Sequence, residues 1–156
     1  MLTPGGRLSI FEGVASFREP EPCGVFLGCD VGAVEDLAER VKAFYHRVQP
    51  RDTDPMHEFD ERDLLRHAED ARFADIRLDF EAVVARGNPE GWGEKAWDIL
   101  ATAPPNPLVP SLEEVAERVL SPEEARRLLG HLRPLVEAGL RTRRHALAYL
   151  RATRGR

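Results

Sequence analysis

The acidic and histidine side chains that could hold a metal ion gather in one short stretch of the chain. They are His57, Glu58, Asp60, Glu61 and Asp63. Their spacing places them around the start of a helix rather than along one of its faces. Asp60 is a favourable N-cap residue, and acidic residues in the first turn interact well with the helix dipole. We therefore interpret this group as the cap of a helix and expect no metal site.

Other patterns of catalytic residues do not stand out. We find no Ser-His-Asp or Cys-His arrangement, no phosphate-binding loop and no paired carboxylates at a useful spacing. Cys23 and Cys29 are the two cysteines, which is too few for a disulfide framework, and they lack a second pair for a zinc site. We expect both to be reduced thiols in a cytoplasm.

The composition is that of a globular chain of one domain. Of the 156 residues, 42% are hydrophobic and 31% are charged, and the formal net charge of −5 argues against a broad nucleic-acid interface. No apolar run is long enough to cross a bilayer, and the start of the chain lacks a signal-peptide pattern. Residues 141–156 carry six arginines and no acid, which we interpret as a solvated segment rather than an anion-binding patch.

The elements that must position any site follow from turn residues and periodicity. Pro4, Gly5 and Gly6 form a turn, after which the apolar pattern predicts a short strand over 7–11. Residues 13–32 are expected to be a loop, and a period of three to four predicts a helix over 33–48. A second helix is expected from Asp60 to about Ala71.

The second half of the chain alternates between clear and weak signals. Strict alternation over 75–84 predicts an outer antiparallel strand with one wet face. A short helical piece is expected near Trp97, and Ser-x-x-Glu capping boxes at Ser111 and Ser121 each predict a helix. Residues 145–152 carry apolar side chains on both faces, which suits an interior strand and leaves a short helix as the alternative. The order predicts an α/β fold.

Two segments resemble class I S-adenosylmethionine-dependent methyltransferases, most closely the small-molecule enzymes of the quinone-biosynthesis type. Residues 3–12, TPGGRLSIFE, resemble the loop and fifth strand of that family. Residues 59–76 are similar to its last sheet-flanking helix and the turn into the sixth strand, with Ala71-Arg72-Phe73 where Ala-Gly-Phe is usual. Residues 145–152 would then be the seventh strand, inserted antiparallel between the fifth and sixth.

The resemblance implies a single partial domain over 1–156, with a partial Rossmann-like methyltransferase sheet built from strands near 7–11, 75–84 and 145–152, the last two antiparallel. Residues 33–48 would form a lid-like helix, and residues 86–142 would be an insertion between the last two strands. The family holds its cofactor with a glycine-rich loop after the first strand, an acidic residue after the second and groups after the fourth. None of these is found, since Gly87, Gly91 and Gly93 lie in a proline-rich loop. We therefore expect no cofactor-binding residue here, although the complete enzyme would use S-adenosylmethionine.

The resemblance also suggests where a methyl acceptor would bind. Phe11 and Glu12 end the first strand, Tyr45 lies on the lid-like helix, and Trp92 lies in the insertion. Core packing for Tyr45 and loop-anchoring roles for Glu12 and Trp92 are the alternatives. His46 is a candidate for a general base, with a solvated histidine as the alternative.

Two functions follow as expectations. The chain is the acceptor-side, C-terminal portion of a small-molecule methyltransferase, inactive alone, or it is a non-enzymatic oligomerisation or protein-interaction module derived from that half-fold. Its partners would be a small-molecule acceptor and either a second copy or a complementary N-terminal half chain, with no nucleic acid and no membrane. In both cases the first strand lacks its usual neighbour, which leaves a sheet edge to be covered.

Overall fold

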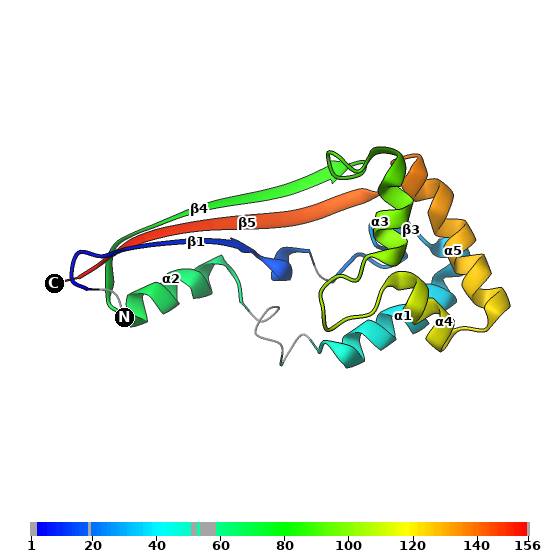
Figure 1. The fold of residues 1–156 in the computed structure, drawn as a ribbon, viewed down its shortest axis with the longest axis horizontal. Helices are drawn as coiled ribbons and strands as arrows, with labels where there is room; N and C mark the ends of the chain where they lie inside the picture. Colours follow the sequence, from blue (N-terminus) through cyan, green and yellow to red (C-terminus); the bar gives the residue numbers. More distant parts are fainter. Residues whose placement is uncertain (1–2, 19, 51–52, 54–58, 156) are drawn as a thin grey trace. The chain divides into compact units, whose positions relative to one another are not determined.

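The computed structural model describes residues 3–18, 20–50, 53 and 59–155, and it divides the chain into two compact units. The sheet unit is formed by described residues within 1–20, 52–84 and 144–156. The helical unit is formed by described residues within 21–51 and 85–143. Figure 1 shows the elements of both units, which we describe separately. His57 and Glu58, two members of the acidic and histidine group, lie outside the described residues.

The sheet unit is built on three strands in the order β1-β5-β4, where β1 is Arg7–Gly13, β4 is Phe73–Arg86 and β5 is Thr142–Arg154. The last two residues of β4 and the first two of β5 belong to the helical unit. Figure 1 draws β1 and β4 in one direction and β5 between them in the opposite direction. The register of β1 and β5 is antiparallel and places Ile10 opposite Leu150. The prediction of an antiparallel interior strand at 145–152 is therefore confirmed, and the described strands contain no parallel hydrogen-bonded pair.

One face of the sheet packs against the helix α2, Glu61–Asp70. The buried residues Leu150 and Ala152 of β5 meet Ala68 of α2, with Leu8 and Ile10 of β1 packed beside them. Because β5 lies between β1 and β4, its side chains that face α2 are more buried than those of β1. The predicted cap of α2 is confirmed, since the Asp60 carboxylate accepts from the backbone N–H of residue 62 and of residue 63.

The strand β4 departs from the regular alternation that its sequence predicts. Asp75 has a φ of 49°, in the left-handed region, within the strand. As a result Phe73 and Ile76, an odd number of residues apart, both pack on the α2 side with Leu78. Further along, Phe80 and Val84 are exposed, so the predicted buried face ends near Leu78 in the described structure.

Four helices make the core of the helical unit: α1 (Glu35–Val48), α3 (Ala96–Thr102), α4 (Leu112–Val119) and α5 (Pro122–Glu137). Both predicted capping boxes are present, because Ser111 and Ser121 each exchange hydrogen bonds with a glutamate three residues later. The innermost side chains include Leu37, Leu128 and Leu132, all at most 1% exposed. Short 3-10 segments at Gly32–Val34 and Gly93–Lys95 lead into α1 and α3, and a third lies in the sheet unit at Ala15–Phe17.

The expected loop over 13–32 is largely present, but it contains a hairpin that was not expected. The strands β2 (Val25–Phe26) and β3 (Cys29–Asp30) form a tight hairpin inside it. The turn residues Leu27 and Gly28 have φ values of 53° and 78°, which is the geometry of a two-residue hairpin turn. The strands are too short to show a periodic pattern, so only the glycine signalled the turn.

No described helix is both long enough and apolar enough to cross a membrane.

Candidate functional sites

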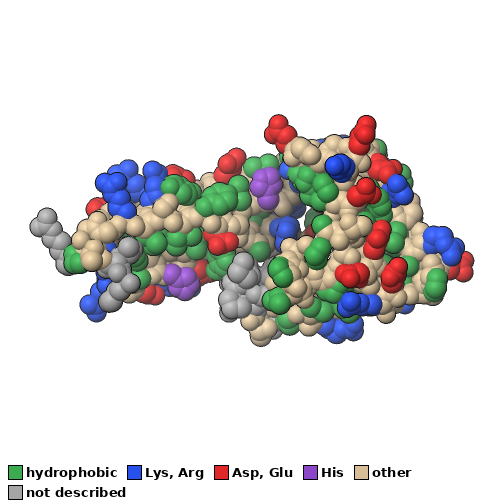
Figure 2. All heavy atoms as spheres, in the orientation of Figure 1, with side chains coloured by type: hydrophobic (Ala, Val, Ile, Leu, Met, Phe, Trp, Pro, Cys, Tyr) green, Lys and Arg blue, Asp and Glu red, His purple; other side chains and the backbone are tan. Residues whose placement is uncertain are grey.

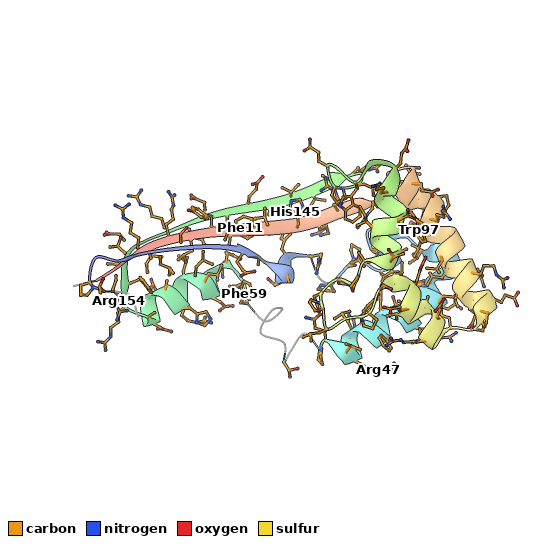
Figure 3. The ribbon with its side chains drawn as sticks, viewed as in Figure 1. Phe11, Arg47, Phe59, Trp97, His145 and Arg154 are labelled. Carbon is orange, nitrogen blue, oxygen red and sulfur yellow. The ribbon has the colours of Figure 1, made fainter. Side chains whose placement is uncertain are left out.

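Of the two candidate residues at the end of β1, Phe11 and Glu12, only Phe11 is exposed to solvent. Phe11 is 67% exposed and lies opposite Tyr149 of β5. Glu12 is half-buried, and its Oε1 accepts a hydrogen bond of 3.1 Å from the N–H of Gly13. That bond supports the loop-capping interpretation of Glu12, whereas the exposed ring of Phe11 is available for contact with another molecule. Figure 3 labels Phe11 on this strand.

The face of the sheet away from α2 carries a polar network that the sequence did not indicate. Ser9 donates from its Oγ to the Tyr149 hydroxyl at 2.8 Å, and Arg151 pairs with Asp79 at 2.7 Å. The Arg151 guanidinium also lies 5.4 Å from the centre of the Tyr149 ring. A shallow hollow of about 280 Å³ borders Arg7 and these β5 residues. We refer to this face, with Arg7, Ser9, Phe11, Tyr149 and Arg151, as the open face.

Tyr45 belongs to the core of the helical unit rather than to a pocket. Its side chain packs against the central cluster and meets Phe44 edge to face, with ring centres 6.4 Å apart. The hydroxyl donates to the Pro110 carbonyl at 3.4 Å. Burial, together with the nearby Glu114 carboxylate, raises the pKa of Tyr45 to about 12. The packing favours the core interpretation, and His46, the next residue, is exposed.

We expect the phenol of Tyr45 to titrate near pH 12 and to make stability fall as the pH rises from 10 to 12. The folded-state pKa lies above the ordinary value of 10.0, so the stabilising contribution is complete below pH 10 and is lost as the pH passes through 12. Phenolate absorbance should show a late step that Tyr45→Phe removes. The late step persisting in Tyr45→Phe would contradict this assignment.

Trp92 anchors a loop against the helical core and stacks with a buried arginine. The Arg141 guanidinium lies 5.8 Å from the centre of the Trp92 ring, and its Nε and Nη1 are shielded from solvent with no hydrogen-bond partner among the described residues. Burial lowers the pKa of Arg141, while the nearby Cys29 and Glu21 oppose that shift. The expectation that Arg141 lies in a solvated segment is therefore wrong.

Glu21 stabilises the turn between β2 and β3 in the helical unit. Its two carboxylate oxygens accept from the N–H groups of Leu27 and Gly28, at 3.0 and 2.7 Å, and so cap the hairpin turn. The Gly28 carbonyl in turn accepts from the Thr142 N–H at 2.8 Å. Burial raises the pKa of the Cys29 thiol, which keeps it protonated and unreactive.

Other arginines of the C-terminal segment also have specific roles. Arg143 donates from its Nε to the Gly87 carbonyl at 3.0 Å, and Arg144 lies 5.4 Å from the centre of the Phe17 ring. Arg154 donates to the Ala71 carbonyl and packs over Phe73. Figure 3 labels Arg154 beside the end of the sheet. These partners are backbone carbonyls and aromatic rings that lie far away in the sequence, so the composition of the segment did not indicate them.

The predicted site residues are divided between the two units. Phe11 and Glu12 belong to the sheet unit, whereas Tyr45, His46 and Trp92 belong to the helical unit, where Tyr45 and Trp92 border the same core. Figure 2 shows acidic and basic side chains interspersed on the surface of the helical unit, with no large cluster of one sign on the visible face. The described residues also contain no group of three or more potential metal ligands.

The residues present do not fit S-adenosylmethionine. A cofactor of this kind needs a glycine-rich turn between a strand and a helix, where backbone N–H groups and the helix N-terminus can meet it. Among the described elements, β1 leads into a 3-10 turn, and β4 leads through the loop of Gly87 to Gly93 and a 3-10 turn into α3. At Gly87, Gly91 and Gly93 an added Cβ would meet nothing within 4 Å, so close packing does not require these glycines. An open α/β sheet binds such a cofactor beyond the ends of parallel strands, and no described strand pair is parallel.

Comparison with protein-family models finds no match for this chain, and comparison with curated proteins finds no relative.

Proposed function

We propose that the chain forms the acceptor-side, C-terminal portion of an S-adenosylmethionine-dependent small-molecule methyltransferase. The observation that carries the proposal is the strand order β1-β5-β4. The last strand of the chain is inserted between the two earlier ones and runs against both (Figure 1). A simple meander would instead give the order of the sequence. Insertion of an antiparallel final strand is what the resemblance implies for the fifth, seventh and sixth strands of the family.

The connections between the strands support the same proposal. The helix α2 directly precedes β4 and packs on the sheet, as the resemblance implies for the last sheet-flanking helix. A helical insertion containing α3, α4 and α5 separates β4 from β5. On this proposal the sheet is one side of a Rossmann-like sheet, and the parallel strands belong to a segment outside these residues.

In this function the chain contributes binding and positioning. Methyl transfer is an in-line displacement that depends mainly on the orientation of the acceptor, and a base is needed only for acceptors that must lose a proton. Phe11 is the candidate for contact with an acceptor, and the Trp92 ring is engaged in its stack with Arg141. Glu12 and Tyr45 are engaged in a loop cap and in core packing, so we assign them a supporting role.

The proposal predicts that the 156-residue chain alone does not bind S-adenosylmethionine. Isothermal titration calorimetry of the purified chain should show no binding heat. Micromolar binding by the chain alone would contradict the conclusion that its residues do not fit the cofactor. A matched control is S-adenosylhomocysteine, for which the same absence of heat is expected.

A reconstitution then tests the methyltransferase relationship itself. The DNA immediately upstream of the Met1 codon should encode, in frame or adjacent, a strand followed by a glycine-rich loop and a helix. Co-expression of that segment with this chain should give a complex that binds S-adenosylmethionine with micromolar affinity. Failure of the complex to bind, or upstream DNA without such a segment, would favour the interaction module instead.

A further inference from the structure

The outer edge of β1 carries backbone groups at alternate residues that no described strand pairs with. The Arg154 N–H donates to the Gly6 carbonyl, and the Val14 N–H donates to the Ala146 carbonyl, at 2.7 and 3.0 Å. Even-numbered residues of β1 therefore direct their backbone groups toward β5. The odd-numbered residues Arg7, Ser9 and Phe11 direct theirs away from it, and no described strand pairs with that edge.

The two edges of this sheet differ in how they are protected. The strand β4 forms the other outer edge of the sheet. Asp75 interrupts the regular backbone of β4 with a positive φ, and the strand carries charges of both signs at Arg77, Asp79 and Glu81. Bulges and charges of this kind discourage edge-to-edge pairing. The central stretch of β1, residues 8–11, contains no charge, no proline and no residue with positive φ. Its edge is therefore open to a further strand.

We propose that two copies of this chain pair through β1, antiparallel and centred on Ser9. In this register the outward-facing groups of Ser9 meet those of Ser9 in the second copy, and Arg7 faces Phe11 in both directions. About six backbone hydrogen bonds form, since each of the three opposed pairs is of the hydrogen-bonded kind. The result is a continuous sheet of the strands of both copies, with a two-fold axis perpendicular to it.

Side-chain complementarity selects this register. On the open face, the Arg7 guanidinium meets the exposed Phe11 ring of the second copy, a favourable cation–π pair that occurs twice. On the face toward α2, Leu8 lies opposite Ile10 of the second copy. Moving the centre by one residue to Ile10 would place Leu8 opposite Glu12 and would require the N–H of Gly13, which is already bonded to the Glu12 carboxylate.

Disulfide trapping tests the register directly. In a Cys23→Ser background, which removes the exposed native thiol, Ser9→Cys should give a disulfide-linked dimer under mild oxidation, because the two Cα atoms would be about 5.5 Å apart. Phe11→Cys is the matched control. Its two copies would be separated by four residues along the strand, about 13 Å, and should not cross-link. Cross-linking of Phe11→Cys but not of Ser9→Cys would overturn the register.

Sedimentation equilibrium of the 156-residue chain alone tests the association. We expect a reversible dimer at micromolar concentration. Ser9→Pro removes an N–H that points away from β5, so the sheet unit should keep its far-UV circular dichroism while the dimer dissociation constant rises by at least about tenfold. If that variant does not fold, Phe11→Arg provides the same test by opposing two arginines. A strictly monomeric wild-type chain, or a folded variant that dimerises unchanged, would overturn the proposal.

The pairing of two copies does not rest on the methyltransferase assignment, and each is tested by its own measurement. Self-association is measured without cofactor or partner, whereas the proposed function depends on binding by a reconstituted complex. A dimer with no reconstituted binding would support the pairing and reject the proposed function, and a monomer with reconstituted binding would do the reverse. A second copy of the chain and a complementary N-terminal segment would both pair with the outer edge of β1. Adding that segment should therefore reduce the amount of dimer.

Discussion

Gly28→Ala is expected to lower the free energy of unfolding of the helical unit by about 3 kcal/mol or more. The cause is steric. A Cβ on Gly28 would lie 2.2 Å from the Thr142 carbonyl oxygen, which is backbone and cannot move away as a flexible side chain could. The hairpin turn would have to shift, and with it the bonds from Leu27 and Gly28 to Glu21 and from Thr142 to Gly28. The φ of 78° adds a further penalty.

Gly24→Ala provides the matched control within the same loop. Its φ of 72° is almost the same, but an added Cβ meets nothing within 4 Å. Only the backbone penalty of about 1 kcal/mol should remain. Denaturant unfolding followed by tryptophan fluorescence measures the difference, because both tryptophans, Trp92 and Trp97, belong to the helical unit. Equal losses in the two variants would show that the contact with Thr142 contributes nothing.

The well-predicted part of the fold consists of elements with strong local signals. The serines of the two capping boxes, the Asp60 cap and the regular apolar period of α1 each fix an element through contacts within a few residues. The interior position of β5 was also predicted, from the resemblance and from the apolar residues on both of its faces. The structure gives β5 that position with one buried face, while Tyr149 and Arg151 lie on the open face. These features depend on short-range chemistry that a sequence displays directly.

The features that escaped prediction depend on contacts between distant residues. The hairpin of β2 and β3 is held by Glu21 and by Thr142, and the latter is more than a hundred residues away in sequence. Arg141 looked like part of a basic tail, yet it stacks on Trp92 inside the helical unit. The end of the buried face of β4 follows from the extent of α2, which covers the sheet only where its own apolar residues reach.

The candidate site was predictable in a similar, limited way. The sequence identified Phe11 as a candidate at a strand end only through the resemblance, and its exposure was not predicted. The hydrogen bond from Ser9 to Tyr149 and the pair of Arg151 with Asp79 require the register of three strands, which no local pattern specifies. Tyr45 was correctly suspected of core packing because it lies on the apolar stripe of α1.

Leu150→Ala should be the most damaging single truncation in the sheet unit. Leu150 is 1% exposed on β5, lies opposite Ile10, and shares a cluster with Ala68 of α2 and with Ile76 and Leu78 of β4. Its side chain therefore packs against residues of β1, β4 and α2 at the same time. Removing it leaves a cavity that none of them can fill alone, and we expect a loss of about 3 kcal/mol.

Hydrogen exchange of the backbone amides of β1, β4 and β5 reports this loss where tryptophan fluorescence, confined to the helical unit, does not. Val84→Ala is the control, since it truncates an apolar side chain of the same unit that is 56% exposed and should cost no more than about 0.5 kcal/mol. If β5 is the interior strand, amides of both its neighbours should lose protection together in Leu150→Ala. Loss confined to one neighbour would mean that β5 lies at an edge, and the strand order on which the methyltransferase proposal depends would no longer hold.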